Sequence, residues 1–386
     1  MKDYLKAIIT EQINRGQCLK KMVGHPLKYS NLLGLAQRCK SIIDSNIQKL
    51  ELLSEELEKR NEDDVRDILR KVRRSIREIE MVEYYGISAL RYATDETGYM
   101  NKLIFRIHNE INFPLDPPSI ACLSTRYYYF HSFTNVIFVP VGESSFILHL
   151  PDVFHELGHE VLFNKDELRL KKVRESYDLA ITRITNYYKE LLSRKTRETG
   201  PRETLLIIAN IHSQWKEYWL DEFFCDLFAL YTLGPAYAWS HLHLTTKTSE
   251  DIYQFSKFLP QTHPSDDSRM KMLLIGLKKL GFDKEASMVL SRWDSLPPVL
   301  NAEPVVEYQY AYPEGMMEEL ADIFLTGLKE SEFAIISPTD LRRQNSNTVI
   351  KQLNEAWASF WNKPDEFRDW EEKCIEKLKA IVTKES

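Results

Sequence analysis

The sequence predicts a predominantly α-helical α+β fold with one small antiparallel sheet. Apolar side chains recur every three or four residues over most of the chain, as on the buried side of an amphipathic helix. Residues 118–150 depart from this pattern, because they contain short aromatic and β-branched runs separated by polar turns. Proline-rich interruptions at residues 112–118 and 297–315 mark boundaries. We therefore expect an N-terminal helical region (1–110), a central core (111–295) and a C-terminal helical region (296–386).

The composition is that of a globular protein. Of 386 residues, 43% are hydrophobic and 28% charged, and the net charge of -6 gives no overall reason to bind nucleic acid. No apolar run approaches the roughly 18 residues of a membrane span, and the N-terminus lacks the layout of a secretory signal. The five cysteines are dispersed without a C-x-x-C pair, which argues against a disulfide framework and a cysteine-based zinc site. We expect a cytoplasmic protein without a membrane span.

Two antiparallel helices are predicted in the N-terminal region. Apolar residues at helical spacing follow one another on either side of an acidic break at residues 61–64. The first stripe comprises Leu35, Ile42, Ile43, Ile47, Leu50, Leu53 and Leu57, and the second Val65, Ile68, Leu69, Val72, Ile76 and Ile79. Four basic residues lie in the second segment: Lys71, Arg73, Arg74 and Arg77. They form either a partner surface or, as is more common, an ordinary solvated face.

The predicted sheet precedes the next helix. Its candidate strands are the runs at residues 127–130, 136–139 and 146–148. Pro151 and Asp152 suit the start of a helix directly after it. Further helices are expected over 165–194, over 205–233 up to Gly234-Pro235, and over much of 236–291, with a loop at 260–265. Three more helical segments are expected in residues 316–386, the last one starting near Pro364.

The stretch PDVFHELGHEVLF, residues 151–163, contains the pattern H-E-x-x-H. On a helix, His155 and His159 stand on one face about one turn apart, which suits a Zn²⁺ ion. Glu156 can then act as the general base that takes a proton from water, as in metalloproteases. Gly158 brings the backbone close to a neighbour or a substrate. The alternative is a core helix whose two histidines bind backbone carbonyls.

A third metal ligand is expected on the aromatic helix 205–233. Glu222 is the best candidate, because a carboxylate among aromatic residues is costly unless it is paired. Asp226 lies one turn further on the same face and can accept a hydrogen bond from a zinc-bound histidine. Asp221 and Glu217 are competitors for the role of ligand. Cys225 could compete for the metal, although a single buried cysteine on such a helix is more often a small core residue.

The order of these motifs resembles the gluzincin metallopeptidases. H-E-L-G-H followed some sixty residues later by E-x-x-x-D is typical of gluzincins, and Thr262-His263-Pro264-Ser265 with Arg269 is similar to the T-H-P-S-x-x-x-R stretch of the HtpX-like and CAAX-processing zinc peptidases. The similarity covers residues 136–269. It implies a zincin-like core within 111–295 and zinc bound by His155, His159 and Glu222.

The resemblance also implies catalytic roles. His263 and Arg269 become candidates for stabilising the oxyanion, ahead of His241, His243 and Tyr231. A strand in residues 133–139 is expected to bind an extended peptide by adding it to the edge of the sheet. These features predict a zinc metallopeptidase that hydrolyses peptide or protein substrates and is regulated by its helical flanks or by a protein partner. The alternative is a non-catalytic binding or scaffold protein that keeps a structural zinc.

Overall fold

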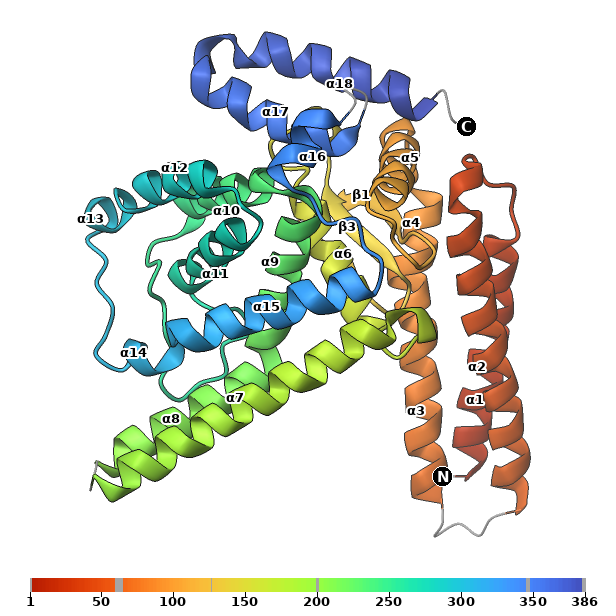
Figure 1. Ribbon diagram of the computed structural model, residues 1–386. Helices are drawn as coiled ribbons and strands as arrows, with labels where there is room; N and C mark the ends of the chain where they lie inside the picture. The colour runs from red at the N-terminus through yellow and green to blue at the C-terminus, as the bar shows by residue number, and fades with distance from the viewer. Residues whose placement is uncertain (1, 60–64, 126, 199–200, 345–347, 384–386) are drawn as a thin grey trace. The chain divides into compact units, whose positions relative to one another are not determined.

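The computed structural model describes residues 2–59, 65–125, 127–198, 201–344 and 348–383 (Figure 1). Two compact units are formed, one by Met1–Phe105 with Pro117–Ser144 and the other by Arg106–Asp116 with Ser145–Ser386. Helices predominate in both units, and a single small sheet lies among the described residues, which confirms the predicted helical α+β class. The units differ from the three predicted regions, because the sheet shares a core with the N-terminal helices.

The first unit contains long helices followed by the sheet. Its elements are α1 (Lys2–Val23), α2 (Leu33–Lys59), α3 (Val65–Met81), α4 (Ser88–Arg91), α5 (Asp95–Glu110, whose last turns belong to the second unit), β1 (Ser119–Ser124), β2 (Tyr129–His131) and β3 (Val136–Pro140). A π-helical segment, Val82–Ile87, joins α3 to α4. Helix α1 packs along α2, and α2 along α3 (Figure 1).

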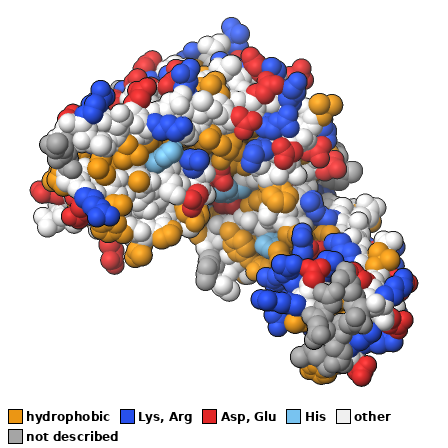
Figure 2. Space-filling model, turned by 90° about the horizontal axis from the view of Figure 1, so that it is seen from below, with side chains coloured by type: hydrophobic (Ala, Val, Ile, Leu, Met, Phe, Trp, Pro, Cys, Tyr) orange, Lys and Arg blue, Asp and Glu red, His pale blue; other side chains and the backbone are white. Residues whose placement is uncertain are grey.

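The two N-terminal helices predicted from the apolar stripes are α2 and α3. The stripe residues Leu50 and Val72 are buried in the shared core. The predicted break at residues 61–64 lies outside the described residues. Figure 2 shows basic and acidic side chains mixed on the face that it draws. On α3, Lys71 Nζ lies 2.9 Å from Asp67 Oδ2 and Arg74 Nε lies 3.0 Å from Glu78 Oε1. Two of the four basic residues therefore face carboxylates of their own helix, as on a solvated face.

The sheet differs from its prediction in three respects, the first of which is that β1 (Ser119–Ser124) is not among the predicted strands. Its order is β1-β3-β2, with β1 parallel to β3 and β2 antiparallel to β3, so the sheet is mixed. The predicted strand at 146–148 is wrong, because this segment forms turns in which His149 N donates to Phe146 O and Leu150 N to Ile147 O. The strand predicted to bind a peptide, β3, is central and bonded on both sides. No free edge is left on β3, so the prediction that it receives a substrate strand is wrong.

The second unit is helical. Its helices are α6 (Asp152–Phe163), α7 (Lys171–Arg197), α8 (Arg202–Gln214), α9 (Leu220–Leu233), α10 (Pro235–Thr248), α11 (Asp266–Lys279), α12 (Asp283–Trp293), α13 (Leu296–Leu300), α14 (Tyr308–Ala311), α15 (Glu314–Glu330), α16 (Pro338–Arg343), α17 (Val349–Asn362) and α18 (Phe367–Thr383). A π-helical segment, Trp215–Trp219, joins α8 to α9. None of the described helices has both the length and the apolar character needed to span a bilayer.

Helix α9 lies at the centre of the second unit. It packs against α6, α10, α11 and α15, and almost every one of its residues is buried (Figure 1). Helix α6 is buried over most of its length in the same way. Because a helix enclosed on all sides is apolar all round, the few charged side chains on α6 and α9 stand out. Their carboxylates and imidazoles need partners inside the unit.

Candidate metal centre

Helix α6 carries the two histidines of the H-E-x-x-H pattern on one side. It begins after Pro151, and the rings of His155 and His159 lie one turn apart with centroids separated by 4.9 Å. His155 is largely enclosed, with 10% of its side chain exposed, whereas 28% of the His159 side chain is exposed. The pair is therefore accessible from the side of His159.

Glu222 of α9 lies against both imidazoles. Its Oε2 is 3.5 Å from His155 Nε2, and its Oε1 is 3.7 Å from His159 Nε2. Two ligand atoms that are each about 2.0–2.1 Å from a tetrahedral zinc lie about 3.3–3.4 Å apart, so both separations are within a few tenths of an ångström of a zinc site. Oε2 is buried and has no hydrogen-bond partner. A buried carboxylate oxygen without a donor fits a metal ligand.

The two competing carboxylates have other partners. Glu217 Oε1 accepts a hydrogen bond from Ser213 Oγ at 2.7 Å, on the exposed side of the π-helical segment. Asp221 accepts a hydrogen bond from the hydroxyl of Tyr177. Among the three acidic residues considered from the sequence, Glu222 is the one whose carboxylate meets the histidine pair.

Nδ1 of His155, the ring nitrogen that does not face Glu222, contacts a carboxylate and a phenol. Asp226 Oδ1 lies 3.1 Å from His155 Nδ1, as expected for the residue one turn beyond Glu222. The hydroxyl of Tyr237 donates to Asp226 Oδ1 over 2.6 Å and lies 2.9 Å from His155 Nδ1. With Nδ1 engaged in this way, Nε2 faces Glu222, and this arrangement is the one usual for a histidine that binds a metal.

Tyr237 reaches this position because of the turn between α9 and α10. Gly234 adopts φ +92°, a conformation that favours glycine over residues with a side chain. Pro235 then starts α10, whose first turn returns toward α6. The sequence signal Gly234-Pro235 predicted a helix end, but it carried no information on the direction in which the chain continues. Tyr237 was therefore not among the predicted site residues.

Arg269 lies behind Asp226. Its Nε and Nη2 donate to Asp226 Oδ2 and Oδ1 over 2.8 and 2.6 Å, which is a two-point ion pair. Ser265 caps the N-terminus of α11 by accepting from Ser268 N, and Arg269 follows in the first turn. The predicted role of Arg269 at an oxyanion gains no support from these contacts, because two of its donor nitrogens are directed to Asp226.

His263 lies on the open side of the cluster. Its Nε2 is 3.8 Å from Glu222 Oε1, and 64% of its side chain is exposed. Its Nδ1 is 3.0 Å from Thr262 Oγ1. This position, next to the proposed metal ligand and in contact with solvent, is compatible with the predicted contact to a reacting substrate.

The charges of the site favour a cation. Burial lowers the pKa of His155, but the adjacent carboxylates of Asp226 and Glu222 outweigh burial and raise it to about 10. Burial raises the pKa of Glu222, yet the adjacent His155 ring, followed by the charge of His159, lowers it to about 2. Burial is the main reason why the pKa of His159 falls to about 4. Without a metal, a proton on His155 and the guanidinium of Arg269 balance the carboxylates of Glu222 and Asp226, and a cation bound at Nε2 would take the place of that proton.

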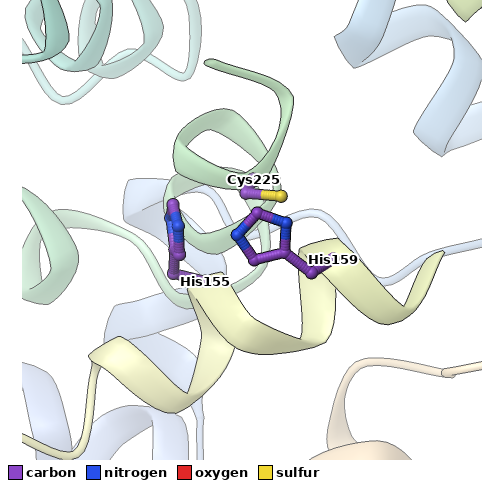
Figure 3. A group of neighbouring side chains, drawn as sticks. All are labelled: His155, His159 and Cys225. Carbon is purple, nitrogen blue, oxygen red and sulfur yellow. The ribbon is translucent and has the colours of Figure 1, made fainter. Parts of the chain in front are cut away.

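Cys225 lies beside the same histidines. Its Sγ and one nitrogen of each of His155 and His159 are all within 4.8 Å of one another (Figure 3). Burial raises the pKa of the Cys225 thiol, and the charges of Glu222, Asp221 and Glu156 raise it further. The sequence favoured a core role for this residue. Its position shows that it is also a candidate ligand.

Gly158 explains how α6 and α9 come so close. An ideal Cβ placed on Gly158 would lie 2.8 Å from Cys225 Cα, so any side chain at this position would collide with the backbone of α9. The predicted close approach at Gly158 is confirmed, with α9 as the neighbour. Glu156, the proposed base, is buried on α6 directly after His155.

The weaker candidates lie in other surroundings. His241 Nε2 is 3.3 Å from Asp266 O, His243 packs against Trp357, and the Tyr231 hydroxyl donates to Ala321 O.

Comparison of the chain with models of protein families, with curated proteins and with solved structures gives no match.

Proposed function

We propose that the chain is a zinc-dependent metallopeptidase. The observation that carries this proposal is the convergence of His155, His159 and Glu222, with the Oε2 atom of Glu222 buried and lacking a hydrogen-bond donor. The order of the motifs, which resembles that of gluzincins, supports the same assignment. A zincin-like organisation of the surrounding helices is part of the proposal.

In this proposal, His155, His159 and Glu222 are the residues that would hold zinc. Bound zinc supplies a Lewis acid that polarises the scissile carbonyl and acidifies a water molecule. Asp226 and Tyr237 hold His155 in the tautomer with its proton on Nδ1. Arg269 is a positioning residue, because it acts on the metal ligand through Asp226.

In this proposal, Glu156 transfers the proton and His263 stabilises the negative charge that develops on the substrate. Glu156 accepts a proton from the attacking water and delivers it to the nitrogen of the leaving amine. Thr262 Oγ1 lies 3.0 Å from Nδ1 of His263, and in the tautomer that this proposal requires the hydroxyl donates to Nδ1 and the ring proton lies on Nε2. Nε2–H is then the donor for the oxygen that becomes negative as the carbonyl is attacked.

The substrate is a peptide or protein, and a cytoplasmic location is part of the proposal. The location is supported by the five cysteines, all of which are free, as is usual in a reducing compartment. Regulation by a protein partner or by the helices outside the metal centre also remains part of the proposal.

A second function is a binding or scaffold protein with a structural zinc. Cys225 favours it, because a fourth protein ligand next to the two histidines and Glu222 would give the closed coordination of structural sites. Under this alternative, zinc stabilises the fold and Glu156 has no chemical role.

The experiment that separates the two functions compares peptide hydrolysis and stability with and without zinc. A broad peptide library is incubated with the zinc-loaded protein, with protein stripped by a chelator, and with stripped protein to which zinc has been restored, and products are identified by mass spectrometry. The proposal expects cleavage in the first and third samples only. Bound zinc that raises the thermal midpoint, with no cleavage by the wild type or by Cys225→Ala, which lacks the candidate fourth ligand, would favour the scaffold.

A further inference from the structure

Helix α9 presents two metal-binding side chains toward α6, and only one of them is used in the proposed centre. Glu222 and Cys225 are three residues apart, so their side chains lie on the same side of α9, one turn from each other. Helix α6 presents His155 and His159 in the same way. Four potential ligands, two from each helix, therefore meet where the helices are closest.

We propose that the thiol of Cys225 is a fourth ligand of the metal held by His155, His159 and Glu222, and that it keeps the site latent until it is released. This inference rests on the proposed peptidase function. The sulfur lies within 4.8 Å of a nitrogen of each histidine, and Figure 3 shows it beside the His159 ring. The buried Oε2 of Glu222, which has no hydrogen-bond partner, independently indicates that a cation belongs here.

The distance that remains is small enough for side-chain rotation to close. At a tetrahedral zinc, a sulfur at about 2.3 Å and a nitrogen at about 2.0–2.1 Å lie about 3.6 Å apart. Because Sγ lies within 4.8 Å of a nitrogen of each histidine, it is at most about 1.2 Å farther away than this, and it turns about the single Cα–Cβ bond. The backbone of Cys225 is already fixed at the closest point of the two helices, against Gly158.

The chemistry of the step is simple. The S–H bond of Cys225 breaks, its proton leaves to the solvent, and a sulfur–metal bond forms in its place; thiolate is a preferred ligand of zinc. Four protein ligands leave no position for water, whereas a catalytic zinc site keeps one position open. Hydrolysis then requires the sulfur–metal bond to break and the sulfur to take up a proton again.

The test replaces zinc with Co²⁺, whose bond to a thiolate gives an intense charge-transfer absorption in the near ultraviolet. The wild type, Cys225→Ala and Cys225→Ser are loaded with cobalt, and metal content and thermal unfolding are measured on each sample. The matched control is Cys374→Ala, which removes another buried thiol, one that donates to Gln352 Oε1. Cys225→Ser preserves the size of the side chain if the alanine variant is unstable.

The proposal expects the thiolate band in the wild type and in Cys374→Ala, and its loss in both Cys225 variants, which still bind cobalt. A cobalt-loaded wild type without the band would overturn the assignment of Cys225 as a ligand. With zinc, the folded Cys225 variant is expected to cleave peptides at least about tenfold faster than the wild type, because its open form is always populated. Equal cleavage rates would overturn the latency.

The spectrum tests whether Cys225 is a ligand, and the cleavage assay tests the peptidase function, so either claim can be wrong without the other. If the band is present but neither the wild type nor the Cys225 variants cleave any peptide, Cys225 is a ligand and the peptidase function is wrong. If the band is absent and the wild type cleaves, the peptidase function stands and Cys225 is a packing residue.

Discussion

Arg269 and Asp226 form a buried two-point ion pair beside the proposed metal centre. The guanidinium donates over 2.8 and 2.6 Å, Asp226 is fully buried, and 15% of the Arg269 side chain is exposed. Asp226 in turn lies 3.1 Å from Nδ1 of His155. Asp226 of α9 therefore connects Arg269 of α11 to His155 of α6, a proposed zinc ligand.

Replacing Arg269 with alanine is expected to destabilise the protein by about 3–5 kcal/mol, because Asp226 would keep its charge in the interior without a cation. Urea unfolding measures the loss. The control is Arg183→Ala, since Arg183 pairs with Glu319 over 2.9 Å with both side chains about half exposed. The control should change stability by at most about 1 kcal/mol. Equal effects of the two substitutions would contradict a structural role for the buried pair.

Tyr237→Phe is expected to weaken zinc binding by about 10–100-fold, the range typical of groups that orient a metal-bound histidine. Competition with a zinc indicator measures the affinity. Tyr231→Phe is the matched control, because it also removes a buried hydroxyl, which donates to Ala321 O over 2.9 Å and has no part in the metal centre. Both substitutions should cost about 0.5–1.5 kcal/mol of stability, and only Tyr237→Phe should alter zinc affinity. The same zinc affinity in both variants would rule out the orienting role.

Glu222→Gln is expected to lower zinc affinity by more than about 100-fold, because removal of a zinc ligand should weaken zinc binding more than removal of a group that only orients a ligand. Glu217→Gln, which changes a carboxylate that accepts from Ser213, should leave zinc binding unaltered. The two proteins are compared by metal analysis after dialysis against a weak chelator. Loss of zinc from the Glu217 variant, with zinc retained by the Glu222 variant, would assign the third ligand to Glu217.

The side-chain neighbours that the sequence predicted correctly are those that lie on a single helix. The 3.6-residue period placed His155 with His159 and Glu222 with Asp226, and apolar spacing located α2 and α3. The partners across helices needed one further consideration, the cost of burying a carboxylate, which singled out Glu222.

What the sequence missed depends on packing between distant segments. No spacing rule connects Tyr237 to His155, because the direction of α10 is set by the turn at Gly234. The sheet is mixed and the segment 146–148 forms turns, since β-branched runs show that a segment is apolar without fixing its partner. The proximity of Cys225 to the histidines likewise depends on the close approach of α6 and α9 at Gly158.

His108 is expected to make the protein sensitive to acid. Burial lowers the pKa of this histidine to about 3, and its ring packs on Phe113 with centroids 4.1 Å apart. In the unfolded chain, a histidine binds a proton below about pH 6.5, whereas folded His108 stays neutral down to about pH 3. Stability is therefore fully present above pH 6.5 and falls by about 1.4 kcal/mol for each pH unit below it.

Urea unfolding at pH 7.5 and pH 5 tests this expectation. The loss of stability between these values should be about 2 kcal/mol smaller in His108→Leu than in the wild type. His25→Leu, a change at an exposed position, should leave the loss unchanged. An identical loss in the wild type and His108→Leu would show that His108 does not stay neutral in the fold.

The most direct test of the peptidase function is the parallel measurement of zinc content and peptide hydrolysis in the wild type and in Glu156→Gln. Glu156 follows a proposed ligand on α6 but is assigned to proton transfer, so its amide should leave zinc bound at about one ion per chain. Hydrolysis should fall by about 10²–10⁴-fold, the usual contribution of a general base. A Glu156→Gln protein that hydrolyses peptides at the wild-type rate, or one that loses zinc while keeping its fold, would contradict the proposed division between metal ligands and base.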